Sequence, residues 1–273
     1  MMEREYQYLI SGLPNISPED TKTWISIPDF RNYLEEHLHQ DDFFQVRLLF
    51  LKHDRRNIIK YLETGEINPE SAGNFTTEDF NDRDNLQQET GSSGGSIPPY
   101  MAEVLLKYGD GMGEVKASQI SHELENGFYG YIMSNGCTFL KRFIEFDYNL
   151  NNLLTFIKAR QHKIDQQMFI SGDSSHAQHL HNNPGKNIVK DHDFEHFDEI
   201  ISFTGNPSFA EEEKRVDLLR WNVIEEMILF RNFSIDRVLG YLLQMLIIDR
   251  WSALNRKSGE KKLRNILIHS NYI

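Results

Sequence analysis

The sequence has little cysteine and little positive charge. Its 273 residues include a single cysteine, Cys137, so one chain can build neither a disulfide framework nor a thiolate zinc site. Lysine and arginine number 29 against 41 acidic residues, which gives a net charge of −12. Proteins that bind nucleic acid or anionic membranes without sequence preference rely on a basic surface. We therefore expect neither nucleic acid nor an anionic membrane as a direct partner.

Long apolar runs and export signals are also missing. No apolar stretch reaches the length of about 20 residues that a membrane-spanning helix needs. The first residues, MMEREYQYLISGLP, contain neither the basic nor the apolar region of a secretory signal. The sequence predicts an intracellular chain, and attachment to a membrane machine through other proteins remains open.

Catalytic motifs are absent too. No G-x-S-x-G sequence occurs, and the glycine-rich stretch at 109–113, GDGMG, lacks the Lys-Ser/Thr of a phosphate loop and is predicted to be a turn. The adjacent Glu225 and Glu226 do not face each other on a helix, so they cannot act as an acid/base pair. We expect no enzymatic activity and no cofactor.

What the sequence does contain is helical periodicity, most clearly at 206–255. Apolar residues recur there at spacings of three and four, and a corner at Asn232 and Phe233 separates two long helices. In the second helix, residues Val238–Ile248 are apolar nearly all round, which predicts a helix surrounded by protein. Ser234 is the expected N-cap of this helix, and Gly259 marks its expected end.

Other segments complete a mainly α, elongated fold with long packed helices. Further helices are predicted at 28–38, 41–62, 97–108, 114–133, 138–169 and 191–201, and Tyr6–Leu13 is either a strand or a helical turn. We expect one helical unit over 1–273 with flexible insertions at 64–99 and 171–190. The first insertion carries the linker-like GSSGGS, and its alternative interpretation is a functional lid.

A histidine cluster is the strongest sign of a metal site. The cluster spans 21 residues of the chain and comprises His176, His179, His181, His192 and His196. His192 and His196 are four residues apart and would share one face of a helix. However, the sequence between them, HDFEH, does not match HExxH. Solvated loop histidines are the favoured interpretation, and a metal site with His192, His196 and His179 as candidate ligands is the alternative.

Two segments carry a resemblance to a known family. The helix FSIDRVLGYLLQMLIIDRWSAL, with Ile235, Val238, Leu239, Tyr241, Leu242, Leu243, Asp249 and Arg250, resembles the C-terminal part of the C subunit of V/A-type rotary ATPases, known as the d subunit in eukaryotic enzymes. The stretch at 143–165 carries Leu154, Lys158 and Arg160 after Asp and Asn residues, as a helix of those proteins does. The chain is more similar still to an uncharacterised bacterial family that resembles the C subunit and accompanies V-type ATPase components.

This resemblance implies a non-catalytic structural subunit. The C subunit is a funnel-like helical protein that couples the central stalk to the membrane rotor ring during ion transport, such as proton transport, without binding nucleotide. The resemblance implies stalk and ring proteins as partners and a cytoplasmic position, peripheral to the inner membrane. The alternatives are a metal-binding protein or metal-dependent enzyme that uses the cluster from His176 to His196, and a helical scaffold for an unrelated partner. The Gly/Ser insertion and the histidine-rich segment depart from the pattern of the C subunit.

Overall fold

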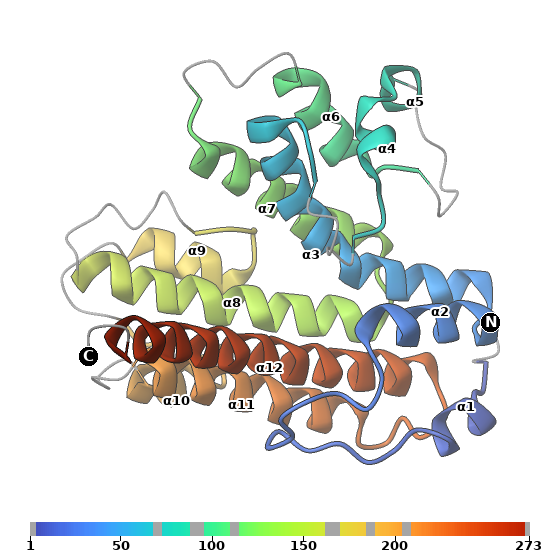
Figure 1. Cartoon of the computed structure of the whole chain (residues 1–273), viewed down its shortest axis with the longest axis vertical. Helices are drawn as coiled ribbons and strands as arrows, with labels where there is room; N and C mark the ends of the chain where they lie inside the picture. Colours follow the sequence, from blue (N-terminus) through green and yellow to red (C-terminus); the bar gives the residue numbers. More distant parts are fainter. Residues whose placement is uncertain are drawn as a thin grey trace. The chain divides into compact units, whose positions relative to one another are not determined.

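The regular structure of the chain is helical. The computed structural model describes residues 4–67, 73–87, 96–109, 115–161, 170–183, 189–203 and 209–270. Every regular element in these ranges is a helix, as Figure 1 shows, so the predicted mainly α class is confirmed. No helix in the described ranges is long and apolar enough to cross a membrane.

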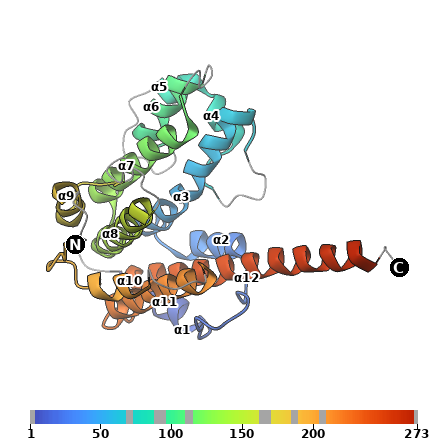
Figure 2. The same cartoon turned by 90° about the vertical axis from the view of Figure 1, so that its left-hand side faces the viewer.

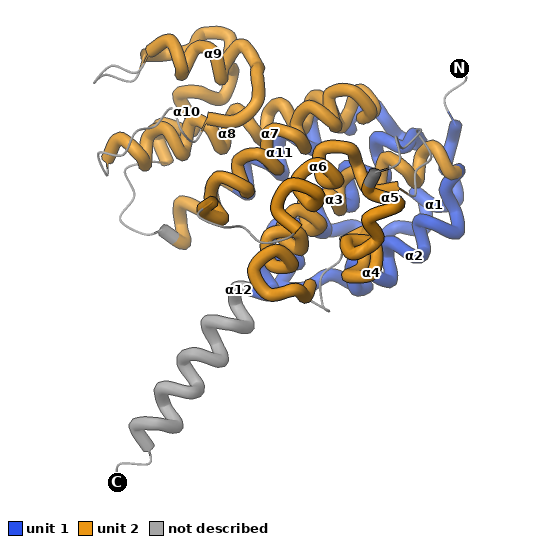
Figure 3. Tube along the Cα trace, turned by 90° about the horizontal axis from the view of Figure 1, so that it is seen from above, with its two compact units in different colours: residues 1–39, 217–273 blue, residues 40–216 orange. Residues whose placement is uncertain are grey.

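The chain divides into two compact units, where the sequence predicts a single one. Unit 1 comprises residues 1–39 and 217–273, and unit 2 comprises residues 40–216 (Figure 3). The two ends of the chain thus belong to one unit. Helical periodicity reveals which face of a helix is buried but not which distant segment covers it, so the sequence could not show this pairing.

Unit 1 is organised around α12 (Ile235–Ser270), which follows the corner after α11 (Phe209–Ile228). Residues 217–228 of α11 belong to this unit, together with α1 (Gln7–Ser11) and α2 (Ile27–His37). Helix α2 packs along α12, as Figures 1 and 2 both show. Val238, Leu239 and Leu242 of α12 are fully buried, which confirms the predicted central helix.

The Tyr241 side chain of α12 binds the N-terminal segment through hydrogen bonds and a ring contact. The Tyr241 hydroxyl donates to the Pro14 carbonyl oxygen at 2.9 Å and accepts from Trp24 Nε1 at 2.9 Å. The Phe30 ring of α2 lies 5.8 Å from the Tyr241 ring. Burial raises the pKa of Tyr241, so its hydroxyl remains a hydrogen-bond donor at neutral pH. These contacts explain why residues near the N-terminus belong to unit 1.

Three predictions in unit 1 need correction or completion. Residues Gln7–Ser11 form a helix and not a strand. The Ser234 side chain does not cap α12, because its buried Oγ has no hydrogen-bond partner among the described residues. Helix α12 continues past Gly259 to Ser270, since an interior glycine costs only about 1 kcal/mol relative to alanine.

Unit 2 contains the remaining helices. These are α3 (Gln40–Thr64), α4 (Thr77–Asn81), α5 (Arg83–Gln87), α6 (Pro99–Tyr108), α7 (Ala117–Asn135), α8 (Thr138–Gln161), α9 (Ser175–Asn182) and α10 (Phe197–Phe203). Helices α3, α6 and α7 pack together, and α8 packs against α7, α9 and α10 (Figure 2). The long helices α3 and α8 are confirmed over their described lengths, and residues 162–169 lie outside the described ranges.

The two predicted insertions contain helices. In the range 64–99, α4 and α5 follow a segment that Asp54 of α3 holds through the backbone N–H groups of Asn74 at 2.6 Å and Phe75 at 3.1 Å. Residues 68–72, 88–95 and 110–114 lie outside the described ranges, and so do most of GSSGGS and GDGMG. The insertion predicted at 171–190 contains α9, because the Ser174 hydroxyl accepts from the Ala177 N–H at 3.1 Å and caps a helix there.

Candidate functional site

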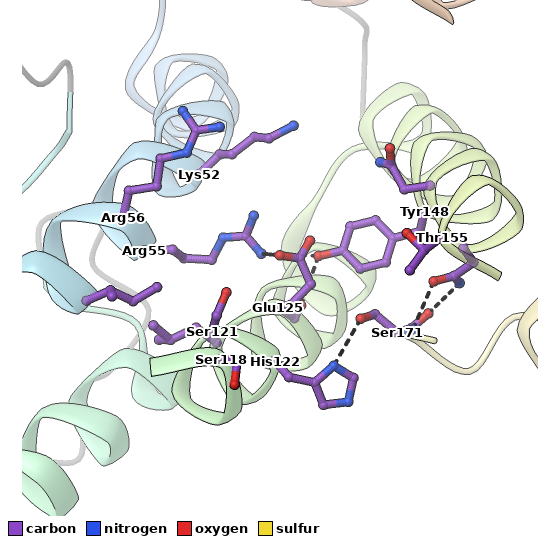
Figure 4. A pocket seen from close by; sticks show the side chains of 14 residues that line it. Lys52, Arg55, Arg56, Ser118, Ser121, His122, Glu125, Tyr148, Thr155 and Ser171 are labelled. Carbon is purple, nitrogen blue, oxygen red and sulfur yellow. Dashed lines mark hydrogen bonds and ion pairs between the residues drawn. The ribbon is translucent and has the colours of Figure 1, made fainter. Parts of the chain in front are cut away.

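A polar cavity of about 550 Å³ opens in unit 2 (Figure 4). Helix α3 contributes Lys52, Arg55 and Arg56, α7 contributes Ser118, Ser121, His122 and Glu125, and α8 contributes Tyr148, Asn152 and Thr155, while Ser171 lies just beyond α8. Most of these side chains are charged or can form hydrogen bonds. We refer to this site as the polar cavity.

Helical spacing explains why each helix presents several of these side chains to one space. On α3 the cations are three and four residues apart, at positions 52, 55 and 56. On α7 positions 118, 122 and 125, and on α8 positions 148, 152 and 155, follow steps of four and three residues. Such steps place side chains on one helix face. Three polar stripes, one from each helix, therefore form the walls.

Arg55 is the central charged group of the polar cavity. Its Nη1 lies 2.8 Å from Glu125 Oε2 and 3.4 Å from the Tyr148 hydroxyl, to which it donates. Its guanidinium carbon lies 4.5 Å from the centre of the Phe128 ring, a cation–π contact. The Arg55 side chain is only 9% exposed. Its buried Nε has no hydrogen-bond partner among the described residues.

The protonation states around Arg55 follow from these contacts. Burial lowers the pKa of Arg55, but Glu125 and Tyr148 act in the opposite direction, and the pKa is raised overall. Burial also raises the pKa of Tyr148, whose hydroxyl donates to the Glu125 backbone oxygen at 2.9 Å. At neutral pH the polar cavity therefore contains a cationic Arg55 and a neutral Tyr148.

The segment that follows α8 in the described ranges is attached beside the polar cavity by asparagine side chains. Asn152 Nδ2 donates to the Ser171 carbonyl oxygen at 2.8 Å, and Asn152 Oδ1 accepts from the Ser171 N–H at 2.9 Å. The Ser174 hydroxyl donates to Asn149 Oδ1 at 2.6 Å. Asn149 and Asn152 are buried and fix the backbone of this segment.

The charge of the polar cavity is opposite to that of the whole chain. Three cations line it against one carboxylate, Glu125, although the chain as a whole has a net charge of −12. Lys52 Nζ also lies 3.8 Å from Asp147 Oδ2. Sequence reasoning missed this site. The available signal was the K-x-x-R-R pattern at 52–56, a basic face in a helix of an acidic protein.

The histidine cluster contains one deeply buried member. His176 of α9 is buried, and its Nδ1 lies 2.6 Å from Asp191 Oδ2. Its ring centre is 4.6 Å from that of Phe194. Burial lowers the pKa of His176, and this effect exceeds the opposite effect of Asp191. The interpretation of these histidines as solvated is therefore wrong for His176, which is part of the interior of unit 2.

The three candidate metal ligands take different positions. His179 Nε2 lies 3.1 Å from the Val189 carbonyl oxygen, the His196 ring packs 5.3 Å from Phe146, and His192 is exposed. His192 and His196 do not share a helix face, because α10 begins only at Phe197. Across the described ranges, no group of three or more His, Cys, Asp or Glu side chains is arranged to hold a metal ion. Metal binding by these residues stays a prediction.

Comparison with known proteins places the whole chain in one group. Residues 2–270 match the model of a family described as "Protein of unknown function (DUF2764)". No curated protein matches the sequence. No solved structure matches the chain either.

Proposed function

We propose that this chain, which belongs to the DUF2764 family of proteins of unknown function, is a non-catalytic structural subunit of a V/A-type rotary ATPase. In this proposal it couples the central stalk to the membrane rotor ring during ion transport. The sequence feature that carries the proposal is the resemblance of residues 143–165 and 220–251 to an uncharacterised bacterial family that itself resembles the C subunit. Those residues include the end of α11 and the buried part of α12, together with much of α8. The chain would lie on the cytoplasmic side of the inner membrane, held there by the complex.

The interior of unit 1 suits a part that transmits torque. Helix α12 is covered on several sides, and Leu239, Leu242 and Met245 are inaccessible to solvent. Gly240 brings α12 close to α11, since a Cβ atom there would lie 2.8 Å from Ile228 Cγ2. Close-packed apolar interiors deform little under load. A stiff pair of helices is what a coupling element between two rotor parts requires.

The corner between α11 and α12 supplies a candidate contact surface. Leu229 is 62% exposed, Phe230 89% and Phe233 41%. We call these three residues the apolar corner. Large apolar side chains gathered in one exposed turn commonly mark an interaction site. The turn is also held in place, because the Tyr6 N–H donates to the Phe233 carbonyl oxygen at 2.7 Å and Arg231 Nε lies 3.6 Å from Asp236 Oδ2. We assign the apolar corner as a contact with other rotor proteins.

Affinity purification tests the proposal. The tagged chain is expressed in its native host, extracted in mild detergent and analysed by mass spectrometry. Wild type should recover the stalk and ring proteins of a V-type ATPase. The double variant Leu229→Ser/Phe230→Ser should recover at least tenfold less of them and keep the wild-type melting temperature, because both side chains are exposed.

A matched control tests whether the loss of recovery is specific to the apolar corner or follows from the loss of any exposed apolar side chain. Leu218→Ser changes an apolar residue of α11 that is 44% exposed, outside the apolar corner, and should leave recovery unchanged. Recovery of the chain alone, from a preparation in which the ATPase is demonstrably intact, would overturn the proposal. Reproducible recovery of an unrelated complex would do so as well and would favour a helical scaffold.

A further inference from the structure

We propose that the polar cavity of unit 2 binds a small organic phosphate. This inference rests on the side chains of the polar cavity and is independent of any role in a rotary ATPase. The bound anion would lie between the cations of α3 and the hydroxyl groups of α7 and α8. It would accept hydrogen bonds from Arg55 and charge interactions from Lys52 and Arg56.

Arg55 has unused hydrogen-bonding capacity. A guanidinium carries five N–H groups, and the contacts of Arg55 to Glu125 and Tyr148 both involve Nη1. The Nε–H and one N–H of Nη2 point in parallel along the other edge of the group, and Nε has no partner among the described residues. A buried donor without a partner loses its interaction with water and gains nothing in return. One oxygen atom of a phosphate could accept from Nη2, and a small shift of the guanidinium would bring the buried Nε to a second oxygen atom, which is the paired geometry that arginine offers to phosphate.

Glu125 orients the Arg55 side chain for phosphate binding and leaves part of its hydrogen-bonding capacity unused. The Glu125 carboxylate contacts Nη1 at 2.8 Å, while the Phe128 ring lies against the guanidinium plane. These contacts hold the side chain in one orientation before a ligand arrives. In Figure 4 Arg55 reaches from α3 toward Glu125 of α7. Because one side of the guanidinium is occupied, the ligand must approach the remaining edge.

The remaining charge and donors of the polar cavity match a phosphate group. Lys52 and Arg56 are accessible, and they belong to the same helix face as Arg55. Glu125 offsets Arg55 and Asp147 lies near Lys52, so the three cations still leave a net positive charge. A phosphate monoester carries between one and two negative charges at neutral pH. The hydroxyl groups of Ser118, Ser121 and Thr155 line the other walls. They can donate to the phosphate or to hydroxyl groups of the organic part.

Size favours an organic phosphate over a bare ion. The volume of about 550 Å³ lies within the range of about 300–1,000 Å³ that is usual for small-molecule sites. A single inorganic phosphate would fill only a small part of it. A nucleic acid is disfavoured because the chain as a whole is acidic, with a net charge of −12.

Calorimetric titration of the purified full chain tests the inference. The probes are ribose 5-phosphate and inorganic pyrophosphate, at low ionic strength, with ribose and sodium sulfate as comparison ligands. We expect one saturable site per chain for ribose 5-phosphate, and at least tenfold weaker binding of ribose and sulfate. The double variant Lys52→Gln/Arg56→Gln should weaken ribose 5-phosphate binding at least tenfold and keep the melting temperature of the free protein.

A control variant tests whether the loss of binding is specific to cations of the polar cavity. Arg142→Gln removes an exposed cation of α8 that does not line the polar cavity, and it should bind ribose 5-phosphate as wild type does. Absence of saturable binding for both phosphate probes would overturn the inference. So would equal binding of sulfate, binding that survives the double variant, or preferential binding of a triglutamate peptide, which would indicate a site for a protein carboxylate.

Discussion

The interiors of the two units are built from different side chains. Unit 1 buries mainly apolar residues around α12. Among its described side chains the buried charge is Asp217, which is paired with Arg220 at 2.9 Å and with Arg250. Unit 2 buries a larger set of polar groups, which includes Asp54, Arg55, Asn149, Asn152, His176 and Asp191. Most buried polar groups in proteins have hydrogen-bond partners. In unit 2 Asp54 and Asn152 bind backbone groups of connecting segments, Arg55 contacts Glu125 in the polar cavity, and His176 contacts Asp191.

This difference suggests a division of work. An apolar interior gives stiffness, but it distinguishes poorly between polar ligands. A polar interior costs desolvation free energy, and in return it fixes loops and presents oriented donors. This division is compatible with the two proposals above, in which unit 1 would serve mechanical coupling and unit 2 would bind an anion. If this division holds, the stability of unit 2 depends on its buried polar groups more than the stability of unit 1 does.

The largest effect is expected at Asp54, which anchors the segment before α4. Its carboxylate accepts from the backbone N–H groups of Asn74 and Phe75 and, at 2.7 Å, from Asn74 Nδ2. Hydrogen bonds to a charged group contribute about 1.5–3 kcal/mol each. Asp54→Ala should therefore lower the free energy of unfolding by about 3–5 kcal/mol, measured by urea denaturation. Glu63→Ala, an exposed change on the same helix, should cost less than about 0.5 kcal/mol. Equal losses in the two variants would disprove an anchoring role for Asp54.

A pair of amide-to-leucine changes compares the two units directly. Asn152→Leu in unit 2 leaves the buried N–H and carbonyl groups of Ser171 without their partners, and should cost about 2–3 kcal/mol. Gln244→Leu in unit 1 places an apolar side chain among buried apolar neighbours of α12, and should be neutral or stabilising by up to about 1 kcal/mol. Chemical denaturation of both variants measures the difference. If Gln244→Leu proves the more harmful, the comparison between the interiors is wrong.

Glycine-to-alanine changes in α7 should affect stability according to the space available at each position. A Cβ atom at Gly127 of α7 would lie 2.4 Å from Tyr100 Cδ2 and 2.7 Å from Tyr100 Cβ, whereas at Gly130 it would meet no atom within 4 Å. Gly127→Ala should cost about 1–3 kcal/mol because the bulky ring must shift. Gly130→Ala should stabilise α7 by about 0.5–1 kcal/mol. Thermal melts that rank these two variants in the reverse order would contradict the packing of α6 against α7.

The smallest effect concerns pH. Because the pKa of His176 is lowered in the folded chain, the unfolded chain binds more protons below about pH 6.5, the ordinary pKa of histidine. Stability should therefore fall as the pH drops below that value. The pKa of Asp191 is also lowered, since hydrogen bonds from His176 and the Asp193 N–H outweigh its burial. Its contribution is present above the ordinary aspartate pKa of about 3.9 and is lost below it.

Urea unfolding at pH 7.5 and pH 5.0 measures the histidine effect. His176→Gln should reduce the difference in stability between the two pH values. His192→Gln, a change of an exposed histidine in the same cluster, should retain the wild-type difference. An unchanged pH dependence in His176→Gln would show that other groups cause it.

Periodicity predicted the helices well but not their partners. The apolar periodicity of α3, α8, α11 and α12 extends over many residues and so outweighs the local preferences of single residues. The sequence therefore predicts these helices and the corner at Asn232. It did not reveal α9, where a single serine cap, Ser174, outweighs a polar composition. The polar cavity was also hidden, because a polar stripe on one helix can face either solvent or a second polar stripe. Lys52, His122 and Thr155 become one site only when three separate helices meet.

The most direct test of the coupling role is ion transport in inverted membrane vesicles from a strain that lacks the gene. Our account predicts that these vesicles hydrolyse ATP without ATP-driven ion uptake. Added purified chain should restore uptake, and the Leu229→Ser/Phe230→Ser variant should restore at most one tenth as much. Full ATP-driven uptake in vesicles that lack the chain would contradict a coupling role.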